Sequence, residues 1–267
     1  MVSDINIIYL PTSPWSVKVL WAFDLLGVEI NKYDVYTPVR DEYWLRWKTG
    51  KYTGTITAPV LLYKDDQQNS SIIFESAEMV EFADKIRAAD KPSLLPEQFK
   101  NDIIEWNNMI DSMQNSQRAL TFQKIISSDE EALLSKLPSF FKSSYTLWLG
   151  KRLATNTFKG LASKYPAGTP EQCQQDTHDA LQKIRTRLQE NKSGYLFGDS
   201  ITYADLNTVI AFQGIKPVDE HILPMDPYLR RNMTYLEIAD QYRDLIEWRD
   251  TIIQNHFKVN IERLVQH

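Results

Sequence analysis

The chain has 267 residues, of which 43% are hydrophobic and 24% charged, as in an ordinary globular protein of one large or two modest domains. Its net charge of −5, without a long block of like charges, gives no electrostatic pattern for nucleic acid. The sequence has no apolar run of membrane-spanning length and no signal-peptide pattern. We therefore expect a cytoplasmic protein that binds neither membrane nor nucleic acid.

Cysteine usage leads to the same expectation. Cys173 is the single cysteine of the chain, which excludes an intramolecular disulfide and a cysteine-based metal cluster. It lies in a polar run, and we interpret it as incidental. A reducing compartment is expected, and we expect no bound metal.

The first 87 residues alternate short apolar runs with helical patterns, in the order β-α-β-α-β-β-α. A β-α-β unit followed by a hairpin and a closing helix predicts a small four-stranded mixed sheet with helices on both faces. The predicted strands are Ile5–Leu10, Val28–Tyr36, Pro59–Tyr63 and Ile72–Phe74, and the predicted helices are Val17–Leu26, 41–49 and Glu75–Arg87.

The remainder of the chain is predicted to be helical. Residues 88–97 carry two prolines and are interpreted as a linker, so the predicted domains are 1–87 and 98–267. The segment 214–234 holds three prolines and is expected to be an extended connection. The predicted helices are 98–126, 129–163, 170–190, 203–213 and 235–264, which make an all-helical bundle.

Residues 13–16 have the sequence Ser-Pro-Trp-Ser, with Ser13 and Ser16 at its ends, and lie between the first predicted strand and the first predicted helix. Unpaired backbone N–H groups and the positive end of the helix dipole meet at such a junction, which favours an anion such as a thiolate. The spacing is that of a Cys-x-x-Cys motif with both sulfurs replaced by oxygen. A hydroxyl at Ser13 can donate a hydrogen bond to the thiolate of a ligand. The alternative interpretation is that Ser13 is only a helix N-cap.

Two further segments suggest contacts to an extended ligand. Pro59 begins a strand, and a cis bond after Ala58 would leave the Ala58 backbone able to pair with a peptide. Glu75 and Ser76 begin the third helix, where a hydroxyl and a backbone N–H suit a carboxylate and a glutamate suits an ammonium group. The alternatives are a strand-entry proline and a helix cap.

In order and spacing, these three segments resemble the N-terminal thioredoxin-like domain of the cytosolic glutathione transferase family, most closely its serine-type classes. The resemblance implies that Ser13 activates the glutathione thiol and that the bond before Pro59 is cis. It also implies that Ala58 pairs with the cysteinyl backbone of glutathione, while Glu75 and Ser76 hold the γ-glutamyl end. The fold class it implies is an α+β thioredoxin-like domain followed by an all-α bundle.

A fourth match lies far downstream, where residues 196–206 resemble a buried helix start of the family. Thr202 and Asp205 are predicted to form an N-cap pair, with Ile201 as its hydrophobic staple. One departure from the family pattern is the segment 37–57, which lacks the usual Asn-Pro and the basic residue before the proline dipeptide. Lys48 or Lys51 can reach the glycine carboxylate of glutathione, but no motif decides between them, and the alternative is that both are solvated lysines on the surface of a helix.

The expected function is therefore a glutathione transferase that conjugates the glutathione thiolate to an apolar electrophile, with glutathione as co-substrate and Ser13 stabilising the thiolate. The electrophile is expected between the Trp15 region and the first long helix of the bundle. The alternative is a non-catalytic binding protein of the same fold. A glutathione-dependent reductase is disfavoured by the absence of cysteine at positions 13 and 16. We expect a homodimer, because helices 75–87 and 98–113 would otherwise expose apolar faces.

Overall fold

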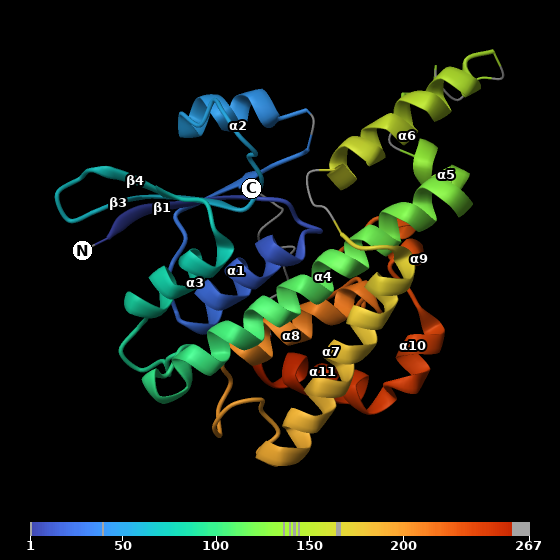
Figure 1. Cartoon of the computed structure of the whole chain (residues 1–267). Coiled ribbons are helices and arrows are strands. Elements are labelled where there is room, and N and C mark those ends of the chain that lie inside the picture. The colour runs from blue at the N-terminus through green and yellow to red at the C-terminus, as the bar shows by residue number, and fades with distance from the viewer. Residues whose placement is uncertain are drawn as a thin grey trace.

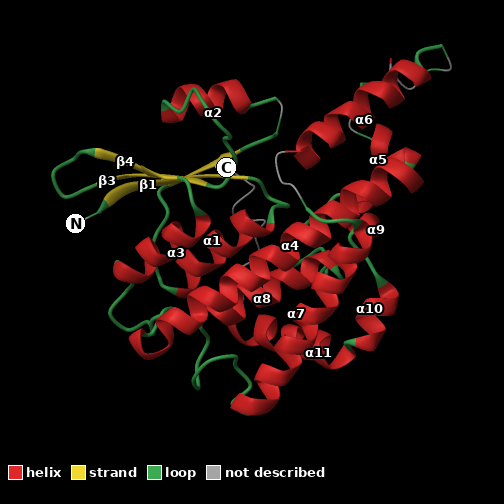
Figure 2. Ribbon diagram, in the orientation of Figure 1, coloured by secondary structure: helices red, strands yellow, loops and turns green. Residues whose placement is uncertain are grey.

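The N-terminal part of the chain is a four-stranded mixed sheet covered by three helices (Figures 1 and 2). The computed structural model describes residues 2–38, 40–135, 137, 138, 140, 143, 145–163 and 167–257. The elements run in the order β1 (Ser3–Tyr9), α1 (Pro14–Leu25), β2 (Lys32–Val35), α2 (Glu42–Thr49), β3 (Val60–Lys64), β4 (Ser70–Ile73) and α3 (Ser76–Lys85).

The strand order is β2-β1-β3-β4, with β1 parallel to β2 and the other neighbours antiparallel. Helices α1 and α3 cover one face of the sheet and α2 lies over the other (Figure 2). Ile7 and Ile8 point to opposite faces of β1 and both are fully buried, as expected for a strand covered on both sides. The predicted thioredoxin-like order β-α-β-α-β-β-α is thereby confirmed.

The second part of the described chain is helical. After the short 3-10 turn Glu97–Phe99, its helices are α4 (Lys100–Ser128), α5 (Glu130–Leu134), α6 (Leu147–Ser163), α7 (Pro170–Asn191), α8 (Tyr203–Ala211), α9 (Pro227–Asn232), α10 (Leu236–Gln241) and α11 (Arg243–His256). A 3-10 turn, Phe212–Gly214, follows α8. No helix among the described residues is long and apolar enough to cross a membrane.

Three predictions about this helical part were wrong in detail. The single helix expected over 129–163 is interrupted, because α5 ends at Leu134 and α6 begins at Leu147. The connection expected to be extended over 214–234 contains α9, which Asp226 caps by accepting from the Tyr228 N–H, with Pro227 at the first position. The last helix is divided at Tyr242 into α10 and α11, and residues 258–264 of that prediction lie outside the described residues.

The predicted cap pair at the start of α8 is present and deeply buried. Asp205 accepts hydrogen bonds from the backbone N–H and the hydroxyl of Thr202 and from the backbone N–H of Leu196, at 2.7–2.8 Å. Burial raises the pKa of the Asp205 carboxyl to about 6, although these hydrogen bonds oppose the shift. The pair fixes the start of α8, a helix whose nine residues are all buried.

Helix α1 connects the two parts of the molecule by packing against both α3 and α8. Eight consecutive residues of this helix, from Ser16 to Phe23, are buried. Trp21 stacks on Phe257 from the end of α11, with ring centroids 4.3 Å apart. The helix that begins at the Ser13 junction is therefore held on one side by its own sheet and on the other by the helical bundle.

A buried ion pair crosses the same interface. The Lys18 ammonium of α1 is fully buried and lies 2.9 Å from Asp111 Oδ1 of α4, which also accepts from the Asn207 amide of α8. Burial lowers the pKa of Lys18, and the Asp111 carboxylate opposes this shift. Asn207 in turn accepts from Gln114, so the polar chain runs from α1 to the middle of α4.

Candidate functional site

A cavity of about 430 Å³ lies where the sheet domain meets the helical part. All five residues that the sequence analysis assigned to the glutathione site line it: Ser13, Ala58, Pro59, Glu75 and Ser76. They come from three separate segments, which lie at the N-terminal ends of α1, β3 and α3. The folded chain therefore brings together residues that are as many as 63 positions apart.

Ser13 is the N-cap residue of α1, but its hydroxyl makes no cap hydrogen bond among the described residues. The first turn is instead closed by backbone bonds, because Ser13 O accepts from the N–H groups of Ser16 and Val17. The side chain of Ser16 is committed elsewhere, since its hydroxyl accepts from the Leu10 N–H at 3.1 Å. Of these two serines, Ser13 lies in the cavity lining, at the positive end of a helix dipole.

The Ala58–Pro59 peptide bond is cis, as the resemblance implied. Pro59 directly precedes β3, whose first residue, Val60, pairs with Ile8 of β1. Both Ala58 and Pro59 line the cavity, so the start of β3 forms one of its walls.

Glu75 occupies the corresponding position at α3. It is the N-cap residue of that helix, with extended backbone angles, and its carboxylate makes no cap hydrogen bond among the described residues. Ser76 begins the helix and is 9% exposed. Two helix N-termini thus present polar side chains to one cavity, and neither side chain caps its own helix.

The two candidate lysines differ in their surroundings. Lys48 Nζ lies 3.6 Å from Asp34 Oδ2 and stands over the ring of Trp44. Lys51 Nζ lies 4.5 Å from the ring centroid of Phe74, which is itself a cavity-lining residue. Neither lysine lines the cavity, but Lys51 contacts a residue that does.

The first long helix of the bundle, which the sequence analysis expected beside the electrophile without naming residues of it, is α4 and forms the second wall of the cavity. Earlier on α4, Trp106 donates to the Thr208 hydroxyl and Met113 is 1% exposed, so these two side chains contribute to packing and do not line the cavity. The α4 residues that line the cavity come later along the helix, and they are Gln114, Asn115, Gln117, Arg118, Thr121 and Phe122. All of these residues except Phe122 are polar. Polar residues in the middle of a long helix with a buried face were the sequence signal that could have identified this part of the lining.

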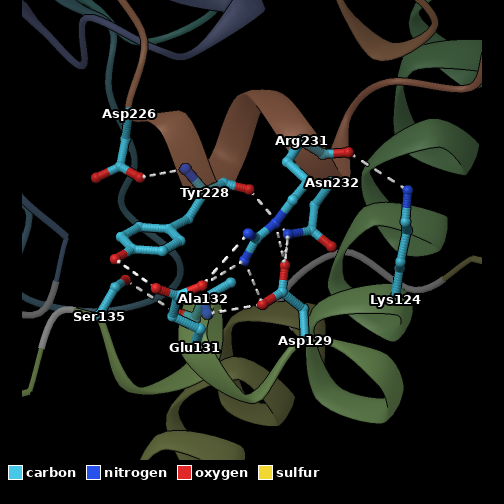
Figure 3. A network of polar contacts seen from close by, with 9 residues as sticks. All are labelled: Lys124, Asp129, Glu131, Ala132, Ser135, Asp226, Tyr228, Arg231 and Asn232. Carbon is cyan, nitrogen blue, oxygen red and sulfur yellow. Dashed lines mark hydrogen bonds and ion pairs between the residues drawn. The ribbon is translucent and has the colours of Figure 1, made fainter.

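Helix α9 supplies a further part of this second wall through Leu229 and Met233. A polar network holds α9 against the junction of α4 and α5 (Figure 3). Arg231 makes two hydrogen bonds to Asp129, at 2.7 and 2.8 Å, and two longer ones to Glu131. Asn232 also donates to Asp129, and the Tyr228 hydroxyl donates to Glu131. These hydrogen bonds hold the short helix α9 in position against α4 and α5.

Asp129 is the centre of this network. Its partial burial opposes ionisation, but hydrogen bonds from Arg231, the Ala132 N–H and Asn232 outweigh that effect and hold the pKa of Asp129 below its usual value. Asp129 is therefore ionised at neutral pH, and its ion pair with Arg231 weakens only as the pH falls through the lowered pKa of Asp129.

Comparison with known families agrees with this arrangement. Residues 12–86 match the model of the glutathione S-transferase N-terminal domain, and residues 157–252 match that of the glutathione S-transferase C-terminal domain. The first match contains all five of the lining residues assigned from sequence. No curated protein sequence matches the chain.

Solved structures share the whole fold at low sequence identity. The β-etherase LigF of Sphingobium has a TM-score of 0.59 at 14% identity, with 99% of each chain covered. Glutathione S-transferase Xi of Phanerochaete chrysosporium has a TM-score of 0.58 at 16% identity, over 95% of this chain and 74% of that one. A glutathione S-transferase of Methylobacillus flagellatus, with glutathione bound, has a TM-score of 0.56 at 15% identity, over 97% and 98%.

These structural similarities lie far below 25% identity and therefore describe the fold alone. The two domain matches go further, because together they cover more than half of the chain in the correct order. With the mixed sheet, the cis-proline and the helical second half in place, the chain belongs to the glutathione transferase family.

Proposed function

We propose that the protein is a glutathione transferase, in which the cavity binds glutathione and the glutathione thiolate attacks an electrophile with an apolar body. The observation that carries the proposal is the pair of helix N-termini beside Ala58 and Pro59. Ser13 and Glu75 occupy N-cap positions without capping, and both line the same cavity. In the Methylobacillus flagellatus structure of the same fold, glutathione is bound.

In this proposal each wall residue meets one part of glutathione. Glu75 accepts from the γ-glutamyl ammonium group, while the Ser76 hydroxyl and N–H bind the γ-glutamyl carboxylate at the start of α3. Ala58 pairs with the cysteinyl backbone in an extended pose. Lys51, which contacts the cavity-lining residue Phe74, is assigned to the glycine carboxylate.

Ser13 acts on the sulfur by donating a hydrogen bond to the thiolate, helped by the N-terminus of α1. A cysteine thiol has an ordinary pKa of about 8.5, and lowering it by about two units requires about 3 kcal/mol. One charge-assisted hydrogen bond together with a helix dipole supplies an effect of this size. Ser13 is thus a stabiliser of the nucleophile and forms no covalent bond itself.

The test combines glutathione titration calorimetry with the ultraviolet absorbance of the bound thiolate across a pH series. Wild type should bind glutathione and show a thiolate below pH 7, whereas Ser13→Ala should bind it with the thiol pKa returned to about 8.5. Ser13→Thr keeps a hydroxyl and should retain part of the shift. Ser16→Ala is the matched control, because Ser16 is buried and absent from the cavity lining.

The possible outcomes separate the two functions weighed from the sequence. If glutathione binds but its thiol titrates normally in wild type, the protein is a binding module and the transferase proposal is wrong. If glutathione does not bind at all, the assignment of Ala58, Glu75 and Ser76 as ligand contacts is wrong as well.

A further inference from the structure

The stretch of chain around α6 differs in charge from the rest of the molecule. Residues 132–170 contain six lysines and arginines and no aspartate or glutamate, whereas the whole chain has a net charge of −5. Positive charge is therefore concentrated in this stretch, and the remainder of the chain is strongly acidic. The expectation of no membrane contact follows from the net charge and from the absence of a membrane-spanning run, and neither property describes how the charge is distributed.

Helix α6 directs small side chains inward and large apolar side chains outward. Ala154 packs in an apolar cluster with residues of α4 and α5, and Gly150, one turn earlier, is also buried. On the outer side, Trp148, Leu149 and Leu153 are 65%, 41% and 44% exposed. A surface helix of a globular protein usually turns its apolar stripe toward the core. A group of large apolar side chains at the surface marks a contact with something outside the chain.

Two cations accompany these apolar side chains. Arg152 and Lys159 follow Trp148 by four and eleven residues, so all three lie on one side of the helix. Both cations are exposed, and neither has an ion-pair partner among the described residues, whereas Lys151 is paired with Glu130 at 2.6 Å. The outward face of α6 consists of five residues: Trp148, Leu149, Arg152, Leu153 and Lys159.

The position of α6 suits contact with a broad surface. The helix projects from the body of the molecule at the upper right of Figure 1, and its N-terminal end lies farthest from the sheet. Trp148 and Leu149 belong to this outer end, because α6 begins at Leu147. At the other end of the helix, Leu161 lines the cavity. The outward face can therefore meet a flat surface while the rest of the molecule stays clear of it.

We propose that the outward face of α6 binds the surface of a membrane that contains anionic lipids. Trp148, Leu149 and Leu153 enter the boundary between the headgroups and the acyl chains, and Arg152 and Lys159 contact the anionic headgroups. Tryptophan beside lysine and arginine is typical of protein segments at a membrane interface. The contact is peripheral, since no described helix is long and apolar enough to cross a membrane.

Other occupants match this face less well. A second copy related by two-fold symmetry would place the same cations opposite one another, and a contact with an acidic region of another copy would not form a closed assembly. Nucleic acid supplies phosphates for Arg152 and Lys159, but it offers no apolar volume for Leu149 and Leu153. An anionic bilayer satisfies both the charges and the apolar side chains.

The test is flotation of the full chain with vesicles of phosphatidylcholine, either alone or with added phosphatidylserine. Glutathione is omitted, so the result does not depend on the proposed transferase function. Wild type should bind the anionic vesicles and not the neutral ones, and its binding should weaken as the salt concentration rises. Arg152→Glu should weaken binding about tenfold, because an attractive charge becomes a repulsive one. Trp148→Ala and Leu153→Ala should each weaken it severalfold.

Matched controls lie at the other end of the helical part. Arg243→Glu changes the net charge as Arg152→Glu does, and Leu236→Ala removes an apolar side chain that is as exposed as those of α6. Both controls should bind vesicles as wild type does. Thermal unfolding should show that all the variants are folded, because every substituted position is exposed.

Absence of wild-type binding to the anionic vesicles at low salt would overturn the proposal, and so would equal losses in the α6 variants and their controls. Binding that depends on Arg152 but not on Trp148 or Leu153 would indicate electrostatic adsorption alone and would also overturn it. Sedimentation velocity without vesicles tests the second copy. Self-association that Trp148→Ala abolishes would assign the face to an interface between copies, and single-stranded RNA that binds in place of vesicles would assign it to nucleic acid.

Discussion

The two walls of the cavity are built in different ways. The sheet-domain wall consists of places where the backbone changes direction, since Ser13 and Glu75 precede helices and Pro59 precedes a strand. The helical wall consists of side chains projected from α4 and α9, and their positions depend on contacts between distant segments. The first wall suits a fixed ligand such as glutathione. The second can change its chemistry by substitution without altering any element of the fold.

This difference predicts where substitutions act. In the helical part, substitution of a buried polar side chain should lower the stability of the protein. Substitution of a polar side chain at the surface should alter only the binding of the second substrate. Four predictions test the comparison.

The largest expected effect is that of Asp205→Ala at the start of α8. The substitution leaves the Leu196 N–H and the Thr202 N–H and hydroxyl buried without their acceptor. Each unsatisfied buried group costs about 1–3 kcal/mol, so the free energy of unfolding should fall by about 3 kcal/mol or more. Urea denaturation measures this, and Asp199→Ala at an exposed position is the control. A loss below about 1 kcal/mol would show that α8 does not depend on this cap.

The same residue predicts a pH dependence. Burial raises the pKa of Asp205 to about 6, above the unfolded value of about 3.9, so the folded state binds more protons between these two values. The contribution of Asp205 to stability should therefore be greatest below pH 4, decline as the pH rises to about 6, and then stay level. Comparing wild type with Asp205→Asn across this range isolates the contribution, and a difference independent of pH would contradict the expectation.

Replacing the two partners of the buried Lys18–Asp111 ion pair should lower the free energy of unfolding by different amounts. Asp111→Asn leaves the fully buried Lys18 ammonium without its counter-charge, and breaking such a pair costs about 3 kcal/mol. Lys18→Met replaces the buried chain with an apolar one, while the Asp111 side chain, 31% exposed, keeps solvent and the Asn207 amide. Its cost should be about 1 kcal/mol or less. Equal losses in urea denaturation would show that the charge of Lys18 is not the dominant factor.

The smallest effect is expected for Arg231→Ala, which detaches α9 from Asp129 and Glu131 (Figure 3). Leu229 and Met233 should then hold the electrophile less firmly, with a few-fold rise in its KM and no change in glutathione affinity. Steady-state kinetics with each substrate varied in turn measures both. Arg243→Ala, which removes an exposed arginine paired within its own chain segment, is the control. A matching loss of glutathione affinity would contradict the separation of the two walls.

The same difference explains how much could be predicted from sequence. Ser13, Pro59 and Glu75 are signalled locally, because each is defined by a strand or helix that begins beside it. The α4 lining is not local: Trp106 and Arg118 lie on one helix, and only the packing of α8 and α9 decides which faces the core and which the cavity. Helix α9 was missed because the three prolines of the segment 214–234 suggested an extended chain, although the Asp226-Pro227 pair is a helix start signal.

The burial of α1 on both sides bears on how the molecule can be divided. A fragment ending at the proline-containing segment 88–97 would keep every residue proposed to contact glutathione, yet it would expose the Lys18 ammonium, Trp21 and the rest of the face that packs on α8. Such a fragment would be prone to aggregation. The glutathione half is therefore not a transplantable module, and engineering of new acceptor preferences should replace side chains of α4 and α9 within the intact chain.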